Sequence, residues 1–232
     1  FIELLAREMT VELQAIKAEA LAQAQLAAAP VTLALSTKGV SFGSITADPA
    51  GTFDTSAVAG VNADLVVRPF HQKGVVVSLR EFTNNAVNHH HGMQSVERFG
   101  AGTDPDGDGK TDELSVGDIT AETIFQATLP APGRVLPNSA LAIQAVNNGE
   151  ALFGSLGCAP CHVPELVLDD PVFSEPNPFN PAGNLQLASV AAPLEVDLTT
   201  DGPGPHLARE VDGSVRVRAF TDLKRHDMGP PL

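Results

Sequence analysis

The two cysteines of this chain, Cys158 and Cys161, stand three residues apart, and His162 follows the second directly. Four kinds of chemistry use such a C-x-x-C pair. A structural zinc site needs four ligands, so two histidines from elsewhere would have to complete it. A thioredoxin-like pair reacts through a thiolate at a helix N-terminus. A plain disulfide across two intervening residues closes too small a loop to stabilise a fold much.

The fourth chemistry, covalent attachment of a c-type haem, accounts for all three residues and for their order. Thioether bonds to the two haem vinyl groups need two cysteines on one helical turn, and His162 would then ligate the iron from the proximal side. The upstream segment GEALFGSLGCAPCH agrees, because a glycine and an apolar–aromatic pair precede the motif. The sequence therefore favours haem c over zinc, a thiol–disulfide pair or a structural disulfide.

The other axial position of such an iron takes a methionine, a histidine or no protein ligand. Met228, in RHDMGPP near the end of the chain, is the first candidate, and His226 is its rival. Met9 lies on the apolar face of a predicted helix and is expected in the core. A second group of candidates, for ligation or acid–base catalysis, is His89, His90 and His91. The alternatives are a Met228 packed in a turn and a polar helix end.

An acidic, glycine-rich loop over 103–115 has the spacing of a calcium-binding loop. Such loops place oxygen ligands at positions 1, 3, 5, 7 and 9, with glycine at position 6. Position 12 is Ser115 rather than a bidentate glutamate, so Glu113 or Asp118 would have to compensate. A solvated acidic loop is the alternative. The calcium candidates are Asp104, Asp106, Asp108, Asp112 and the carbonyl of Lys110.

Hydrophobic spacing and caps predict the elements that must position these residues. The predicted helices cover 1–29, 75–95, 119–128 and 139–156, the last capped by Asn138 or Ser139. Short β-like runs, VTLALS, VSFGSITA and LVVRPF, are predicted within 31–70. An ordered meander is predicted over 163–205, with a flexible loop as the alternative. REVDGSVRVRAF predicts a hairpin with Asp212-Gly213 at its turn.

The composition excludes some classes of partner. The net charge is −14, from 28 acidic and 14 basic residues, which argues against binding to nucleic acid and to anionic membrane surfaces. The Ala-rich segment 18–35 is too polar to span a bilayer, and no other stretch predicts a transmembrane helix. The chain has neither Trp nor Tyr, so large flat groups in its interior must come from Phe or from a bound molecule.

Taken together, the motifs resemble the di-haem oxidoreductase family, a bacterial group related to di-haem cytochrome c peroxidases and sometimes labelled thiol oxidoreductases. The resemblance runs over nearly the whole chain. It implies a mainly α fold, in which 1–135 is the inter-haem part and 136–232 is a cytochrome c-like haem domain with small β-hairpin insertions. It also implies two haems and export to the periplasm or beyond. The similar segments are FIELLAREMTVELQAI, RPFHQKGVVVSLREFTNNAVNHHHGMQSVERFG, DPDGDGKTDELSVGDITA, GCAPCHVPEL and FTDLKRHDMGP.

By this resemblance, Cys158, Cys161 and His162 carry one haem, Met228 matches a distal methionine, and the histidine cluster could serve the other haem. Family members carry a further C-x-x-C-H upstream and continue past HDMGP, so we expect this chain to be the central piece of such a protein. The expected activity is electron transfer within a peroxidase-like oxidoreductase. Its expected partners are a redox protein or second haem domain, and peroxide.

Two alternatives come from other classes of protein. The first is a pure electron carrier or structural cytochrome subunit without a substrate, which would show no response to peroxide. The second is a haem-free thiol–disulfide oxidoreductase that uses Cys158 and Cys161, which would keep both thiols titratable.

Overall fold

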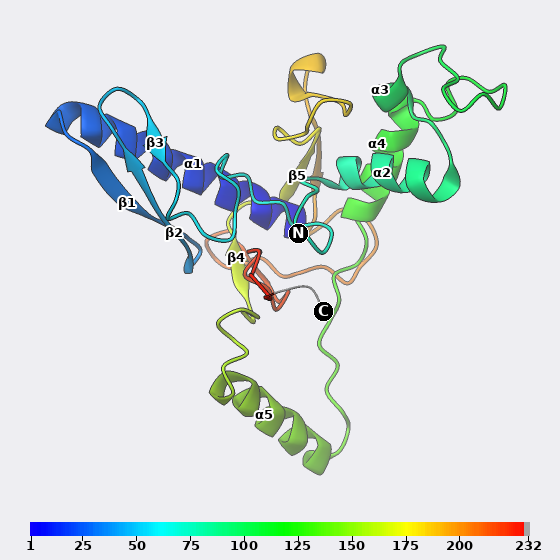
Figure 1. The fold of residues 1–232 in the computed structure, drawn as a ribbon. Coiled ribbons are helices and arrows are strands. Elements are labelled where there is room, and N and C mark those ends of the chain that lie inside the picture. The colour runs from blue at the N-terminus through cyan, green and yellow to red at the C-terminus, as the bar shows by residue number, and fades with distance from the viewer. Residues whose placement is uncertain (230–232) are drawn as a thin grey trace.

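The structure, a computed structural model, describes residues 1–229 and is organised around one long helix, α1 (Ile2–Ala27) (Figure 1). Residues that recur every four or seven positions fall on one face of a helix. That face of α1 is fully buried along Leu5, Met9, Leu13 and Ala20. The helix ends at Ala28, which is left-handed with φ 50°. The predicted helix over 1–29 and the predicted burial of Met9 are confirmed.

A three-stranded antiparallel sheet lies against α1. Its strands are β1 (Val31–Thr37), β2 (Val40–Ala47) and β3 (Phe53–Asp54), in that order. Leu35, Phe42 and Ile45 are fully buried and join the core around α1. The predicted runs VTLALS and VSFGSITA are confirmed as strands.

The predicted run LVVRPF is not a strand. Instead of entering a sheet ladder, the backbone N–H of Val67 donates to Thr10 Oγ1 at 2.9 Å. Thr10 lies on the buried face of α1, so this segment is held as a strap over the helix. Only Phe70 makes a β-bridge, to Val76.

The C-terminal half adds two short antiparallel pairs, β4 (Leu166–Leu168) with β7 (Val215–Val217) and β5 (Val172–Glu175) with β6 (Leu194–Asp197). A 3-10 turn, Leu187–Ser189, lies between β5 and β6. Leu168, Phe173 and Val215 are buried in the same core as α1. Residues on both sides of the expected division at 135 therefore share one core.

The predicted hairpin in REVDGSVRVRAF forms only its turn. The N–H of Glu210 donates to the carbonyl of Ser214 at 2.8 Å. Beyond the turn, Arg209 alone bridges back to Val215. The strand β7 pairs with β4 instead, because that pairing buries Val215 and Val217 in the core.

Helices α2 (Leu79–His91), α3 (Val96–Phe99) and α4 (Val116–Ala127) form a smaller unit beside α1 (Figure 1). Val87, Leu114 and Ile119 are its buried apolar residues. Ser78 and Ser115 cap α2 and α4 by accepting N–H bonds with their side chains. These caps set where each helix begins, so the helices predicted over 75–95 and 119–128 exist with shifted starts.

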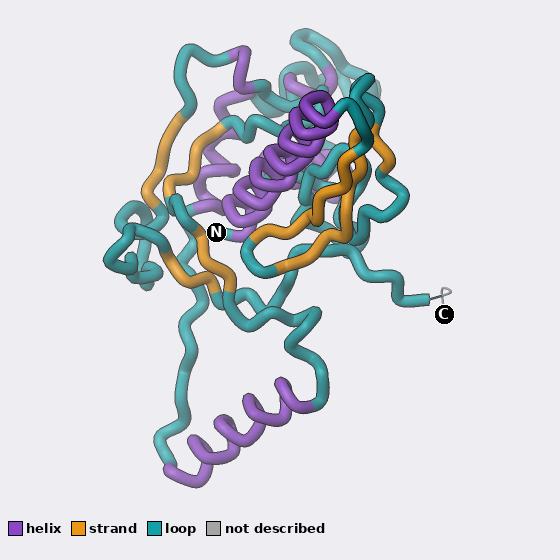
Figure 2. Tube along the Cα trace, turned by 90° about the vertical axis from the view of Figure 1, so that its left-hand side faces the viewer, coloured by secondary structure: helices purple, strands orange, loops and turns teal. Residues whose placement is uncertain are grey.

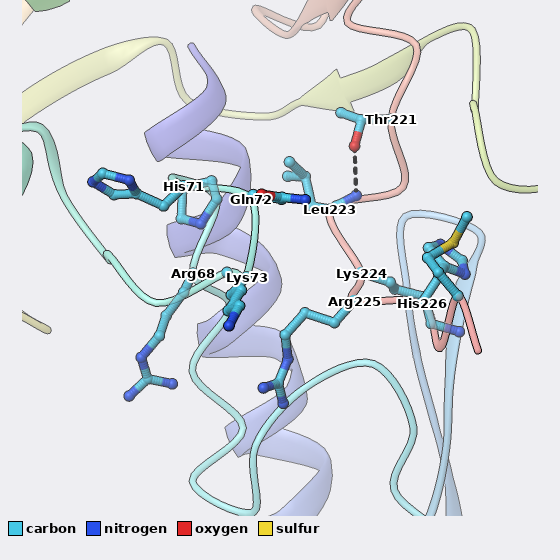
Figure 3. Close-up of a pocket in the computed structure, with 12 residues that line it drawn as sticks. Arg68, His71, Gln72, Lys73, Thr221, Leu223, Lys224, Arg225 and His226 are labelled. Atoms are coloured by element: carbon cyan, nitrogen blue, oxygen red, sulfur yellow. Dashed lines mark hydrogen bonds between the residues drawn. The ribbon is translucent and has the colours of Figure 1, made fainter. Parts of the chain in front are cut away.

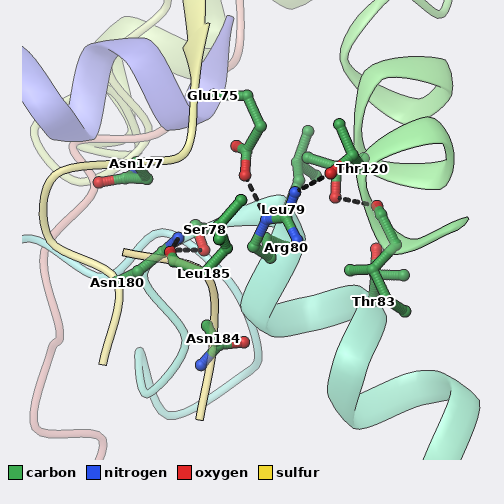
Figure 4. A network of polar contacts seen from close by, with 12 residues as sticks. Ser78, Leu79, Arg80, Thr83, Thr120, Glu175, Asn177, Asn180, Asn184 and Leu185 are labelled. Carbon is green, nitrogen blue, oxygen red and sulfur yellow. Dashed lines mark hydrogen bonds and ion pairs between the residues drawn. The ribbon is translucent and has the colours of Figure 1, made fainter. Parts of the chain in front are cut away.

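A buried polar network joins this unit to the main core (Figure 4). The guanidinium of Arg80 is fully buried, forms ion pairs with Glu97 and Glu175, and donates to Thr120. Burial raises the pKa of Glu175 even though Arg80 opposes the shift. Around it, amides pair with each other and with hydroxyls, as Asn84 does with Asn184 at 2.9 Å. Charge and hydrogen bonding therefore hold α2–α4 in place, together with apolar contacts of Leu79, Ile124 and Ala127 to the main core.

Helix α5 (Ala140–Ser155) stands apart from the rest, on two extended segments (Figures 1 and 2). Ser139 caps it by accepting from the N–H of Ala142 at 3.1 Å, which confirms the helix predicted over 139–156. The helix has no buried residue. Leu141 is 80% exposed and Leu152 is 55% exposed. Within the described residues, the half-buried Phe153 packs near Phe220, whereas these leucines are left exposed.

The expected mainly α, cytochrome c-like fold is wrong. Helix accounts for 32% of the residues and strand for 16%, in several small sheets. The reason is physical: α1 buries its apolar stripe against strands from both halves of the chain, so helix–helix packing does not build the core. None of the helices within 1–229 is both long enough and apolar enough to cross a membrane.

Candidate functional site

The C-x-x-C-H motif begins where α5 ends. Gly157, with φ 78°, lies just past the helix. The N–H of Cys158 donates to the carbonyl of Phe153, and that of Gly157 donates to Gly154. This pair of bonds is a Schellman motif, which needs a left-handed residue, most often glycine, at the position of Gly157. The motif residues are thus fixed directly to the helix end.

One helical turn carries both thiols and the imidazole. The N–H of His162 donates to the carbonyl of Cys158 at 2.9 Å, which closes the turn. Both cysteines are free; Cys158 is half-buried and Cys161 is exposed. The two sulfur atoms are therefore reachable from outside and lie on one turn, the arrangement that two thioether bonds to one macrocycle require.

The exposed ring of His162 makes one hydrogen bond within the described residues. Its Nδ1 lies 3.1 Å from the carbonyl oxygen of Phe220, and a carbonyl can only accept, so Nδ1 carries the proton. The lone pair is then on Nε2, which makes no hydrogen bond within residues 1–229. Metal-binding histidines show this same pattern, with one ring nitrogen donating to a carbonyl and the other facing the metal.

Two phenylalanines fix the surroundings of that ring. The Phe153 ring lies 6.2 Å from the His162 ring and 5.8 Å from the Phe220 ring, measured between centroids. Phe220 has φ 51°, a conformation that costs about 1–2 kcal/mol outside glycine. A strained backbone at this point presents the carbonyl that orients His162.

Both candidates for the other axial position lie in the segment that follows Phe220. His226 Nε2 pairs with the buried carboxylate of Asp222 at 2.8 Å, and its Nδ1 lies 4.0 Å from Cys161 Sγ. Met228 is 90% exposed. Both side chains line one surface cavity of about 480 Å³, between 68–74 and 221–228 (Figure 3). The fold therefore places both candidate axial ligands, His226 and Met228, in one cavity beside the motif.

The histidine cluster is placed elsewhere. His89, His90 and His91 are exposed in the last turn of α2. Helix α2 and helix α5 lie in separate parts of the molecule (Figure 1). The structure does not bring these histidines to the C-x-x-C-H motif, and a role beside a second haem remains a prediction.

The acidic loop gathers three of its expected five ligands. Carboxylate oxygens of Asp104, Asp106 and Asp108 lie within 4.8 Å of one another. Partial desolvation opposes a lower pKa for Asp104, but backbone N–H bonds, foremost from Gly109, lower it on balance. Asp112 instead accepts from the N–H of Gly102 at 2.7 Å.

The two residues expected to compensate at position 12 are engaged elsewhere. Glu113 accepts from the N–H of Gln94 at 2.8 Å, and Asp118 completes the capping box of α4 with Ser115. Calcium binding by this loop remains a prediction.

If the loop binds calcium, saturating CaCl2 is expected to raise the melting temperature of the chain. A ligand at 100 times its Kd stabilises the folded state by about 2.7 kcal/mol. In Asp106→Asn/Asp108→Asn the rise should disappear, because the ion loses two charged ligands. Asp169→Asn is the control, since the acidic cluster of that residue is already occupied by the ammonium of Lys38. An equal response in all three proteins would contradict calcium binding at 103–115.

Several parts of the site gave little or no signal in the sequence. The carbonyl of Phe220, the Asp222–His226 pair and the cavity all depend on one distant segment folding back against the motif. The spacing of Asp222 and His226 by four residues was the one visible hint. Comparisons with protein-family models, curated proteins and solved structures found no match to this chain.

Proposed function

We propose that this chain is a c-type haem unit that transfers electrons, with the haem bound through Cys158 and Cys161 and its iron ligated by His162. The observation that carries the proposal is the state of His162. Its Nδ1 donates a hydrogen bond to the Phe220 carbonyl, and its Nε2 makes no hydrogen bond within the described residues. A histidine placed in this way, on the same turn as two free thiols, has the donor set of a c-type haem.

The surroundings of the motif fit a large flat apolar group. Leu152 and Leu156 are 55% and 75% exposed on either side of the half-buried Phe153. Covering apolar surface stabilises a protein by about 25 cal/mol for each Å² removed from water. Exposed apolar side chains that lie together are therefore typical of a binding surface. A tetrapyrrole attached at Cys158 and Cys161 would provide one.

When bound, a haem iron supplies one-electron chemistry by cycling between the ferric and ferrous states. The residues of this chain would set its properties. The Phe220 carbonyl would orient His162, and either Met228 or His226 would provide the second axial ligand. Because the chain has no Trp or Tyr, it offers no easily oxidised aromatic side chain as a relay. We therefore infer that electrons leave to a second haem domain or a redox partner protein.

The resemblance to di-haem oxidoreductases supports a more specific version of this function. In that version the chain works with a second haem in an exported, peroxidase-like oxidoreductase. The pure electron carrier is the alternative within the haem class. Reaction of the reduced protein with peroxide, followed in the visible spectrum, distinguishes the two: reoxidation supports the oxidoreductase, and an unchanged spectrum supports the carrier.

One observation favours the haem-free alternative, and another opposes it. An imidazole beside a thiol, as His226 is beside Cys161 at 4.0 Å, is a common arrangement in reactive thiol sites. However, Cys158 follows the C-terminal end of α5. Thiol–disulfide enzymes place the reactive cysteine at the opposite end of a helix.

The proposal is tested by producing the full chain with a c-type haem maturation system and measuring its intact mass after denaturation. We expect a mass higher by one haem, together with the sharp α and β bands of a reduced c-type haem. An unmodified mass, with both thiols free to react with a maleimide, would refute covalent haem attachment. It would favour the thiol–disulfide oxidoreductase instead.

A further inference from the structure

The cavity beside the motif is lined by cations. Arg68, Lys73, Lys224 and Arg225 contribute four positive side chains, and no carboxylate is among the residues that line it (Figure 3). Acidic residues outnumber basic ones by two to one in this chain. A positively charged cavity on an acidic protein is therefore a local departure from its general charge.

Three of these four cations form no ion pair in the part of the chain that the structure describes. Arg68 pairs with Asp64 at 2.7 Å, but Lys73, Lys224 and Arg225 form no ion pair within residues 1–229. Lys224 donates to the backbone carbonyl of Ser41 at 2.6 Å, and Arg225 donates to the amide oxygen of Asn62 at 2.5 Å. The ammonium of Lys224 also lies 5.6 Å from the centroid of the Phe42 ring, and the carboxylate of Asp64 attracts Arg225 electrostatically. Both charges are therefore only partly compensated within the protein, and the remainder is available to a ligand.

The wall that carries these cations is fixed by backbone packing. The N–H of Arg225 donates to the carbonyl of Gly60 at 2.9 Å. Gly74 has φ 56°, and a Cβ at that position would lie 3.0 Å from Cγ of Arg225. A Cβ at Gly60 would lie 2.6 Å from Cε of Lys224. The stems of both cations thus occupy space that only glycine leaves free, and this preorganises the cavity.

We propose that this cavity binds carboxylate groups through Lys73, Lys224 and Arg225. Guanidinium and ammonium groups form their strongest hydrogen bonds with such anions. His226 lines the same cavity and lies 4.0 Å from Cys161 Sγ, so the bound carboxylate lies next to the C-x-x-C-H motif. It has two sources: the propionates of a haem on that motif, which rests on the proposed function, or a free dicarboxylate compound.

The first arm of the test uses the haem-free full chain and succinate as the probe. Calorimetric titration at constant ionic strength is expected to show saturable binding, and none of dimethyl succinate, the uncharged analogue. Lys73→Gln/Arg225→Gln should weaken succinate binding by about 10- to 100-fold, the loss of one or two charge-assisted hydrogen bonds. Lys17→Gln, which changes a cation that packs on Phe53 outside the cavity, should leave it unchanged.

Absence of succinate binding, or equal binding by wild type and the double variant with an unchanged melting temperature, would overturn the proposal. The second arm repeats the titration on haem-loaded chain. Two results together identify the propionates as the occupant. The haem-loaded chain no longer binds succinate, and its midpoint potential depends on pH in a way that the double variant alters. Retained binding identifies a free dicarboxylate. If no haem attaches, the first arm still tests carboxylate binding by the cavity. Failure of the carboxylate site can therefore be distinguished from failure of the proposed haem function.

Discussion

Replacing Cys158 and Cys161 together by alanine is expected to abolish covalent haem attachment to this chain. The double variant, made with the same maturation system as the wild type, should show the unmodified mass and no c-type bands. Each single variant keeps one thioether and should shift the α band to longer wavelength, because one vinyl group stays conjugated. These are the largest effects we expect, since the two thiols are the chain's only cysteines.

The histidines and Met228 provide the matched comparisons. Met228→Ala and His226→Ala separate the rival axial ligands: the variant that removes the true ligand should convert a low-spin spectrum to a high-spin one. His89→Ala changes an exposed imidazole at the end of α2 and should leave the spectrum unchanged. Covalent haem in the Cys158→Ala/Cys161→Ala protein would contradict the assigned attachment site.

How much of this molecule could be predicted depends on how local each feature is. The turn of the C-x-x-C-H motif is contiguous, so its residue types and spacing carry the geometry. Helices α1 and α5 are also local, because apolar spacing defines α1 and Ser139 caps α5. Those predictions agree with the structure in type and within a few residues in extent.

The features that the sequence concealed are pairings between distant segments. The strand β7 does not pair within its predicted hairpin. It pairs with β4, which lies about 50 residues earlier along the chain. The Val67 segment has a strand pattern, but its N–H is taken by Thr10 of α1. Such choices are decided by which pairing buries more apolar surface, a quantity that local pattern does not contain. The mainly α expectation failed for this reason.

The buried Arg80 network is also non-local, and its removal is the second large effect that we expect. Arg80→Met should reduce the free energy of unfolding by about 3–5 kcal/mol, the usual penalty when a buried ion pair loses one partner. The carboxylates of Glu97 and Glu175 would remain buried without their shared ion-pair partner, although the charge of Arg7 still acts on Glu175. Because the chain has no Trp or Tyr, urea unfolding is best followed by far-UV circular dichroism. Arg134→Met is the control, since Arg134 and its partner Glu150 are both largely exposed and such pairs contribute about 0–1 kcal/mol.

The pH dependence distinguishes this mechanism from simple loss of packing. Burial already raises the pKa of Glu175 above its ordinary value, and removing Arg80 removes the larger of the two charges that oppose that shift, the other being Arg7. A carboxyl with a higher pKa in the folded than in the unfolded state binds more protons when folded, so stability rises as pH falls from the folded toward the unfolded pKa. The deficit of Arg80→Met relative to wild type should therefore be smaller at pH 5 than at pH 7.5. An equal deficit at both values would show that the lost stability comes from the shape of the side chain rather than from the unpaired carboxylates.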